Sequence, residues 1–213
     1  MRVWVTRTQP GADATAARLR DLGHQPIVSP VLEVRRLKTT IDLDGVDALA
    51  FTSRNGVEAF SVLTNDGRAL PVFAVGQATA DAARACGFAN VRSANGDVEA
   101  LAALIASERP GVVLHPTARE PAGELGVRSV AVYETVPVEP TDALARLKSI
   151  DAVLVHSPLA ARRLAALVAP AQASPQFLCI SQAAAAPLRA AGHEKVRSAP
   201  FPDEAALLKL LDE

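Results

Sequence analysis

DALAFTSRNGV, residues 47–57, is the stretch that decides the fold, and DAVLVHSPLAA, residues 151–161, repeats its pattern. In each copy a short apolar strand ends just before a serine, Ser53 or Ser157, and a helical run follows. Serine is a favoured helix N-cap, and the first N–H groups of a helix lie at the positive end of its dipole. Such a junction suits an anion. Two of them predict one anionic ligand held from two sides.

The repeat extends beyond this stretch. Asp47 and Ser53 match Asp151 and Ser157 at an offset of 104 residues, and Gly87 matches Gly192 at an offset of 105. A repeat of this length predicts two homologous α/β lobes. It leaves open how the four quarters of the chain pair in space, and taken alone it favours a tandem split near Pro110.

Strand-like and helix-like segments alternate throughout the chain. This alternation predicts an α/β fold of two similar lobes, each a parallel sheet flanked by helices. Two longer extended runs, Val31–Leu37 and Val130–Val138, interrupt the alternation, and a short polar piece spans Thr117–Leu125.

Composition excludes several classes of protein. The formal net charge of −1 argues against non-specific binding of nucleic acid. The apolar runs are strand-sized, so no membrane span is expected, and the N-terminus lacks the apolar core of a signal peptide. We therefore expect a cytoplasmic protein. Cys86 and Cys179 lie far apart in apolar surroundings, which favours buried small hydrophobic residues over metal ligands.

Several longer motifs resemble the uroporphyrinogen-III synthase family. They include FTSRNGVEAF, VFAVGQATADAARACGF, VAVYETV, VHSPLAARRL and the ending VRSAPFPDEAALLKLL. Each motif alone is weak, because serine-capped junctions are common, but their order and spacing cover nearly the whole chain.

The resemblance implies that the lobes are discontinuous. Residues 1–31 would join residues 141–213 in lobe one, and residues 37–130 would form lobe two. Residues 32–36 and 131–140 would then pair as a two-stranded β hinge.

The resemblance also implies an activity. A family member cyclises the linear tetrapyrrole hydroxymethylbilane, inverts its ring D, loses water and gives uroporphyrinogen III. This lyase reaction in heme biosynthesis needs a cleft, anion cradles and few catalytic side chains. No cofactor or metal is implied, and the expected protein is a monomer with transient contact to hydroxymethylbilane synthase. A non-catalytic two-lobed binder or sensor of an anionic small molecule is the alternative. A nucleotide-dependent enzyme is disfavoured, because the glycine fingerprint for a dinucleotide is missing.

Carboxylates of the substrate would lie at the strand–helix junctions, where backbone N–H groups supply most contacts. For the serines, plain helix capping is the alternative interpretation, and for Arg7 and Arg54 it is a solvated surface position. The candidate substrate-binding residues are Thr6, Arg7, Ser53, Arg54, Asn55, Gly76, Gln77, Ala78, Thr79, Ser157, Pro158, Leu159, Ser181, Gln182 and Ala183.

Tyr133, the only tyrosine of the chain, is the candidate catalytic residue. Ordinary strand packing would explain it if the family were ignored. The resemblance places it at the family's cleft tyrosine, whose phenol stays protonated at neutral pH and can hydrogen-bond the departing hydroxyl group.

The four histidines do not cluster in the sequence. His24 and His193 follow helix-ending glycines and are expected to be exposed. His115 and His156 follow strands, where satisfied polar groups are expected rather than proton donors.

Two positions depart from the family pattern. Ser181 and Ala184 stand where the family usually has glycine and threonine, and the Thr117–Leu125 piece is shorter than the family's helix there.

Overall fold

The computed structural model describes residues 1–121, 123–170 and 175–212, and it divides the chain into two compact units. Unit 1 comprises Met1–Glu33 and Val136–Glu213, and unit 2 comprises Val34–Thr135. Unit 1 is therefore discontinuous, and the tandem split near Pro110 that the repeat alone favours is not the one that the fold uses. The predicted fold class, two α/β lobes with helix-flanked parallel sheets, is confirmed.

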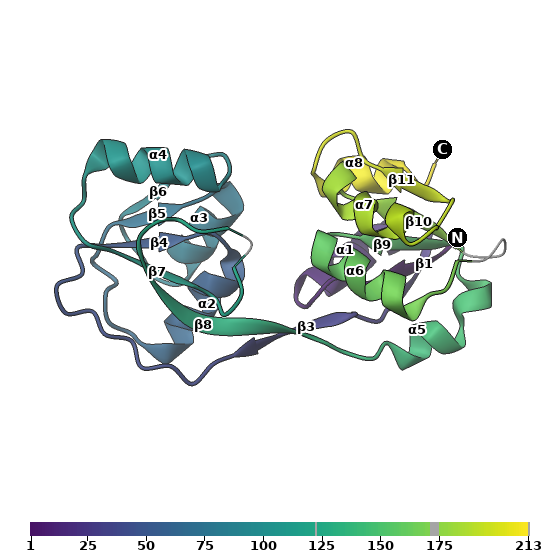
Figure 1. The fold of residues 1–213 in the computed structure, drawn as a ribbon, viewed down its shortest axis with the longest axis horizontal. Helices are drawn as coiled ribbons and strands as arrows, with labels where there is room; N and C mark the ends of the chain where they lie inside the picture. Colours follow the sequence, from purple (N-terminus) through teal and green to yellow (C-terminus); the bar gives the residue numbers. More distant parts are fainter. Residues whose placement is uncertain (122, 171–174, 213) are drawn as a thin grey trace. The chain divides into compact units, whose positions relative to one another are not determined.

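Unit 1 is built on a five-stranded sheet in which every pair is parallel (Figure 1). Its strands, in spatial order, are β11 (Val196–Ser198), β10 (Gln176–Cys179), β9 (Ala152–Val155), β1 (Arg2–Val5) and β2 (Gln25–Val28). Its helices are α1 (Gly11–Asp21), α5 (Thr141–Ala145), the 3-10 helix η1 (Leu147–Ser149), α6 (Pro158–Leu167), α7 (Gln182–Ala190) and α8 (Glu204–Lys209).

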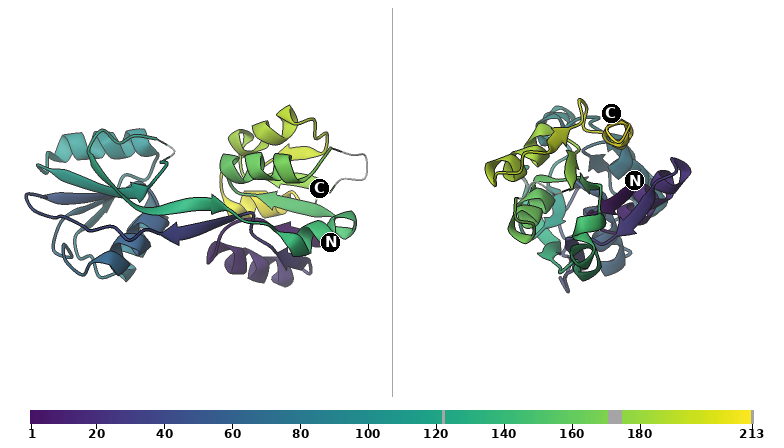
Figure 2. Two further views of the ribbon diagram at one scale, coloured as in Figure 1. Left: turned by 60° about the horizontal axis from the view of Figure 1, so that its bottom comes forward. Right: turned by 90° about the vertical axis from the view of Figure 1, so that its right-hand side faces the viewer.

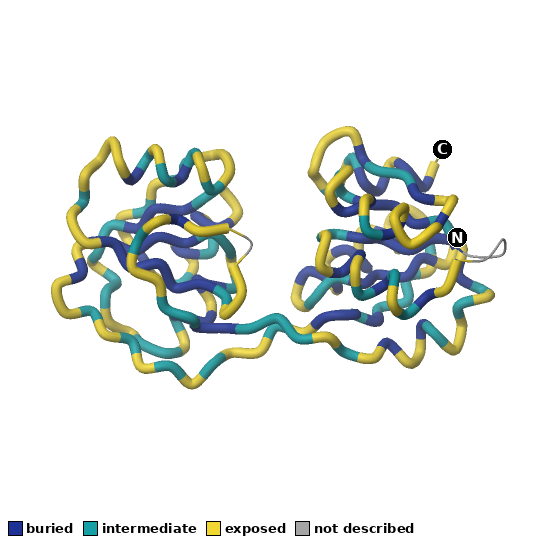
Figure 3. The backbone as a smooth tube through the Cα atoms, in the orientation of Figure 1, coloured by how far each residue is buried: buried dark blue, intermediate teal, exposed yellow. Residues whose placement is uncertain are grey.

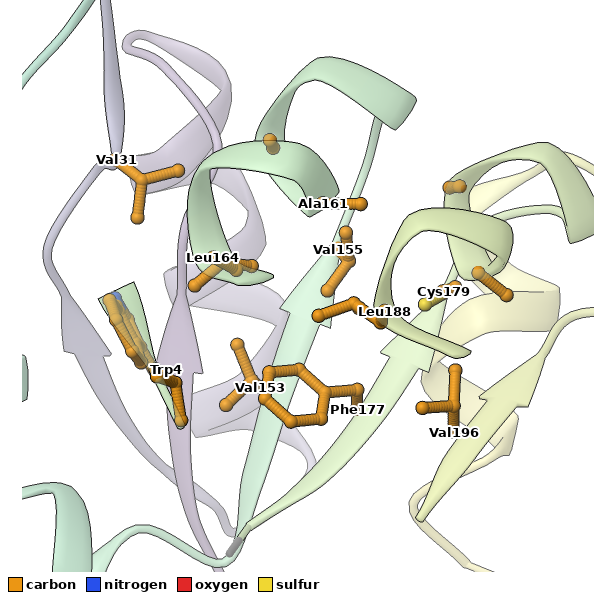
Figure 4. Packing of buried hydrophobic residues seen from close by; sticks show 14 of the residues in the cluster. Trp4, Val31, Val153, Val155, Ala161, Leu164, Phe177, Cys179, Leu188 and Val196 are labelled. Carbon is orange, nitrogen blue, oxygen red and sulfur yellow. The ribbon is translucent and has the colours of Figure 1, made fainter. Parts of the chain in front are cut away.

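Alternate residues of these strands face opposite sides of the sheet and form two cores. On one side, Leu164 of α6 and Leu188 of α7 point toward Val153 and Phe177 (Figure 4). The other core joins β1 and β9 to α1 and α8, through residues such as Val3, Val5, Leu19, Leu154 and Leu207. Dark blue segments in Figure 3 mark these buried strands. The apolar runs seen in the sequence are thus strands covered on both faces.

Unit 2 is built on the second sheet, which has six strands in the described part of the chain; β3 begins and β8 ends in residues of unit 1. In spatial order they are β3 (Leu32–Arg36), β8 (Arg128–Pro137), β7 (Val113–Ala118), β4 (Ala48–Phe51), β5 (Val72–Ala74) and β6 (Val91–Ser93). Three helices cover it, α2 (Arg54–Leu63), α3 (Gln77–Ala85) and α4 (Val98–Glu108). Phe51, Phe60 and Phe88 pack together on one face, and Phe73 packs with Leu101 on the other.

Strands from both halves of the repeat lie side by side in each sheet. In unit 2, β4 of the first copy pairs with β7 of the second, and in unit 1, β9 of the second copy pairs with β1 of the first. The order β6–β5–β4–β7–β8 therefore corresponds strand by strand to β11–β10–β9–β1–β2. This exchange answers how the four quarters pair.

Strands β3 and β8 are hydrogen-bonded neighbours, and Figure 1 and the left view of Figure 2 show them running together. The Leu37 amide donates to the Val132 carbonyl over 3.0 Å, and the Val138 amide donates to the Val31 carbonyl over 3.1 Å. Each of these bonds joins residues of the same unit. A hinge motion about this pair of strands stays a prediction.

The polar piece expected from Thr117 is partly strand. β7 continues to Ala118, because β8 offers backbone partners beyond Leu114, with Thr117 opposite Ala131 and Ala118 opposite Tyr133. The register shifts between Thr117 and Ala118, as in a β-bulge. Within that piece, Ala122 lies outside the described residues.

In the described part of the chain, no helix is long and apolar enough to cross a membrane.

Candidate functional site

Serine caps open the helices at three of the predicted junctions. The hydroxyl of Ser53 accepts from the Gly56 amide at 3.0 Å, that of Ser157 from Ala160 at 3.1 Å, and that of Ser181 from Ala184 at 3.2 Å. All three serines have extended backbone, as N-cap residues require. The three serines are therefore helix caps. The first N–H groups of each helix lie at the carboxyl edge of its sheet and point away from it.

Tyr133 and Ser53 meet in unit 2. The Tyr133 hydroxyl lies 3.0 Å from the Ser53 hydroxyl, although the two residues are 80 positions apart. The ring of Tyr133 is 8% exposed and packs with Val132 and Ala59, so strand packing explains the ring. It does not explain the phenol, which reaches the N-cap of α2. The register shift before Ala118 sets which residue of β7 lies opposite Tyr133.

The second polar pair of unit 2 joins Thr52, just after the end of β4, to His115 within β7. Thr52 Oγ1 lies 3.0 Å from His115 Nε2, so His115 is a satisfied polar group as expected, but it lies within β7 (Val113–Ala118) and not at the end of a strand. Burial lowers the pKa of His115 to about 4, so its imidazole is neutral at pH 7. A neutral ring beside Thr52 links β7 to the residue that follows β4, and it carries no proton to donate as an imidazolium at pH 7.

A glycine brings α2 close to β7. A Cβ atom built at Gly56 would lie 2.8 Å from the Pro116 carbonyl oxygen, which is closer than real Cβ contacts allow. Gly56 thus lets the N-terminus of α2, and with it Ser53, approach the strand next to Tyr133.

Replacing Gly56 by alanine is expected to destabilise unit 2 by about 1–2 kcal/mol, because the strain of overpacking exceeds the preference of a helix for alanine. Moving α2 would also separate Ser53 from Tyr133. The matched control is Gly76→Ala, where the new Cβ meets no atom within 4 Å and the change should stay within about 0.5 kcal/mol. Urea unfolding of both variants measures this difference, and equal free energies of unfolding would contradict the close approach.

The junction after β5 exposes backbone rather than side chains. Gly76 caps α3 with no side-chain hydrogen bond, and no atom lies within 4 Å of the place where its Cβ would be. Gln77 and Ala78 are exposed, whereas Thr79 is buried. Any anion at this junction would therefore meet the N–H groups of the first turn.

Two predicted residues of unit 2, Arg54 and Asn55, are at least partly open to solvent. Arg54 is exposed, in line with the solvated alternative, and Asn55 beside it is half-buried. Their place in the first turn of α2 still puts both next to Ser53.

In unit 1 the side chain of Thr6 is committed to the sheet. It is fully buried, and its hydroxyl donates to the Leu154 carbonyl over 2.6 Å. A contribution of Thr6 to ligand binding could therefore come only through its backbone.

Arg7 belongs to a network that the sequence did not reveal. Its guanidinium lies 3.3 Å from a Glu204 oxygen and 3.4 Å from the Thr15 hydroxyl. Thr15 and Arg18 also donate to Glu204. Gly11 leaves room for this arrangement, since a Cβ there would lie 2.6 Å from Arg7 Nε. Arg7 is one-quarter exposed and is clamped rather than freely solvated.

His156 corrects an expectation. Its side chain is 8% exposed, and in the part of the chain that the structure describes neither ring nitrogen has a hydrogen-bond partner. The expectation that His156 is a satisfied polar group is therefore wrong. The repeat aligns His156 with Thr52, and Thr6 with His115, but Thr6 donates to Leu154 instead. Burial, and then the charge of Arg7, lower the pKa of His156 to about 4, although Glu204, 4.0 Å away, acts in the opposite direction.

Three further side chains differ from expectation. His193 is buried instead of exposed, because its ring packs edge-on against Phe177 at 4.7 Å between centroids. His24 is half-buried. Cys179 is buried as expected, which raises the pKa of its thiol to about 12, whereas Cys86 is only half-buried.

The structure sorts the predicted residues into two groups. Within unit 1, the carboxyl ends of β1, β9 and β10 bring together the neighbourhoods of Thr6, Ser157 and Ser181. Within unit 2, the ends of β4 and β5 bring together those of Ser53 and Gly76, with Tyr133 beside the first. Glu204 and His156 are the polar residues that sequence reasoning missed in these roles. Among the described residues, no three His, Cys, Asp or Glu side chains gather as metal ligands would.

Comparisons with known proteins agree on one family. The family model described as Uroporphyrinogen-III synthase HemD matches residues 13–209. A protein of Methanocaldococcus jannaschii that carries the uroporphyrinogen-III synthase name is 39% identical over 70 residues, 32% of this chain; the match spans only 29% of that relative's length.

Solved structures show the same fold. The uroporphyrinogen-III synthetase of Helicobacter pylori 26695 superposes with a TM-score of 0.72 at 19% identity, over 99% of this chain and 97% of that one. A mutant uroporphyrinogen III synthase of Thermus thermophilus gives a TM-score of 0.59 at 19% identity, over 100% of this chain and 97% of that one.

Proposed function

The chain belongs to the uroporphyrinogen-III synthase family, and we propose that it converts the linear tetrapyrrole hydroxymethylbilane into uroporphyrinogen III, with inversion of ring D and loss of water. This makes it a lyase of tetrapyrrole and heme biosynthesis. The observation that carries the proposal is the Tyr133 phenol, placed 3.0 Å from the N-cap serine of α2, in a chain that the family model matches from residue 13 to residue 209.

The proposed first step is departure of the substrate's hydroxyl group. The phenol of Tyr133 donates a hydrogen bond, and then its proton, to the leaving oxygen, while the pyrrole nitrogen lone pair expels it, which leaves an azafulvene cation and a phenolate. Ser53 orients the phenol. Water leaves with the Tyr133 proton, and the proton released when the last ring regains its aromaticity restores the phenol, so the step needs no other reactant.

Positioning is the larger part of the proposed catalysis. The substrate closes to the wrong isomer without help, so the protein must hold the last ring for attack at its substituted carbon. Helix N-termini at Ser53, Gly76, Ser157 and Ser181 offer N–H groups to its carboxylates, and those groups are fixed before the substrate arrives. Side-chain changes at these junctions should therefore have small effects on binding of the carboxylates.

The test is isomer analysis. Hydroxymethylbilane is made in situ from porphobilinogen by its synthase, the products are oxidised to porphyrins, and the isomers are separated. We expect the type III isomer to dominate. Type I alone, as in the control without this protein, would exclude the synthase activity.

We also propose that the protein is a cytoplasmic monomer and that it contacts hydroxymethylbilane synthase transiently. Such a contact would shorten the time that the substrate, which cyclises by itself, spends free in solution.

A further inference from the structure

The segment between β11 and α8 begins at the carboxyl edge of the unit 1 sheet, where β11 ends (Figure 1). At its start, the Ala199 amide donates to the carbonyl of Cys179, the last residue of β10, over 2.8 Å. At its end, Glu204 binds Arg7, which follows β1, and lies 4.0 Å from His156, which follows β9. Residues 200–203 therefore link a point beside the end of β10 to a point near the residues that follow β1 and β9.

This segment is held firmly along its length. Pro200 and Pro202 restrict its backbone on both sides of Phe201. The Asp203 amide donates to the Phe201 carbonyl over 2.9 Å, and the Asp203 carboxylate caps α8 through the Ala206 amide at 2.7 Å. The two prolines and these hydrogen bonds thus restrict the backbone around Phe201.

Phe201, at the middle of the segment, is 67% exposed. A large apolar ring held in water loses the favourable free energy of burial, and here two prolines and anchors at both ends keep it there. Leu159, in the first turn of α6 on the same sheet edge, is 40% exposed. Apolar side chains therefore stand at the edge where the α6 and α7 N-termini present N–H groups.

An unpartnered polar group lies at the same place. The His156 ring, more than nine-tenths buried, directly precedes the Ser157 cap of α6, and its nitrogens find no hydrogen-bond partner within the described ranges. In unit 2 the equivalent threonine has its partner, His115. Unit 1 thus combines an apolar ring, free helix N–H groups and an unsatisfied imidazole on one edge.

We propose that Phe201 stacks on a pyrrole ring of the linear tetrapyrrole, while the N-termini of α6 and α7 take the carboxylates of that ring. This inference rests on the proposed function for the identity of the ligand and adds Phe201 as a binding contact. A flat aromatic ring bordered by carboxylates matches an aromatic side chain beside anion-binding N–H groups.

The test compares Phe201→Ser with Phe201→Tyr, which keeps the ring. Val62→Ser is the matched control, because Val62 is 63% exposed but lies near the C-terminal end of α2. Two readouts are used: the rise in Tm caused by uroporphyrinogen III, and kcat and KM with hydroxymethylbilane. The Tm rise reports binding whether or not turnover occurs.

We expect Phe201→Ser to weaken uroporphyrinogen III binding and to raise KM by about five- to tenfold with little change in kcat. Phe201→Tyr and Val62→Ser should resemble the parent, and the Tm of all four unliganded proteins should be similar.

Parent-like ligand stabilisation in Phe201→Ser would overturn the inference, and so would a parent protein that uroporphyrinogen III does not stabilise. If the parent binds uroporphyrinogen III, loses that binding with Phe201→Ser, yet forms only type I product, the stacking contact stands and the proposed synthase activity fails.

Discussion

Tyr133→Phe is expected to lower kcat by about a hundredfold while KM stays near that of the parent. The loss follows from the proposed role of the phenol as the proton donor to the leaving hydroxyl, since general acids contribute about 10²- to 10⁴-fold. Phenylalanine keeps the ring in its packing against Val132 and Ala59. The substitution removes only the hydrogen bond to Ser53, so stability should change by about 1 kcal/mol or less.

Ser53→Ala tests how far the orientation of the Tyr133 phenol matters, because the phenol itself is kept. It removes both the α2 cap and the partner of Tyr133, so it should destabilise the protein by about 1 kcal/mol and reduce kcat less than Tyr133→Phe does. Initial rates of type III formation and urea unfolding measure both variants. A Tyr133→Phe protein with parent-like kcat would remove Tyr133 from the mechanism.

Acidification from pH 7 to pH 5 is expected to destabilise the protein through its buried histidines. His115 and His156 have folded-state pKa values of about 4, below the ordinary 6.5. Between these values the unfolded chain binds a proton that the folded chain does not, so lowering the pH favours unfolding. The free energy of unfolding keeps its full value above pH 6.5 and falls as the pH falls toward 4. By pH 5 each histidine should have lowered it by about 1–2 kcal/mol.

The two histidines lie in different units, which makes the effect separable. Trp4, the only tryptophan, is buried in unit 1, so its fluorescence follows the unit that holds His156, while circular dichroism follows the whole chain. In His156→Gln the Trp4 transition should shift less between pH 7 and pH 5 than in the parent. In His115→Gln the pH dependence of the Trp4 transition should be unchanged. Equal pH dependence in the parent and in both variants would show that burial does not control these histidines.

Much of the candidate site could be predicted from short sequence patterns. The serines at residues 53, 157 and 181 could be identified as caps because a cap depends on the residue and its next three neighbours. The same holds for the open glycine at residue 76. Long-range partners could not be identified in this way: Glu204 meets Arg7 across 197 positions, and Thr6 bonds Leu154 instead of His156. The choice between such partners depends on side-chain geometry, which no periodicity encodes.

The sequence by itself determined the two α/β lobes, their parallel strands, the capped junctions and the family, because hydrophobic period, capping residues and motif order are local or linear properties of the chain. Only the tertiary structure decided that β4 pairs with β7 and β9 with β1, since the copies of the repeat carry interchangeable strand patterns. It also decided that the Tyr133 phenol meets Ser53, because the register of β8 against β7 shifts at a bulge. Pairing and register are settled by packing among distant residues, and that packing exists only once the chain has folded.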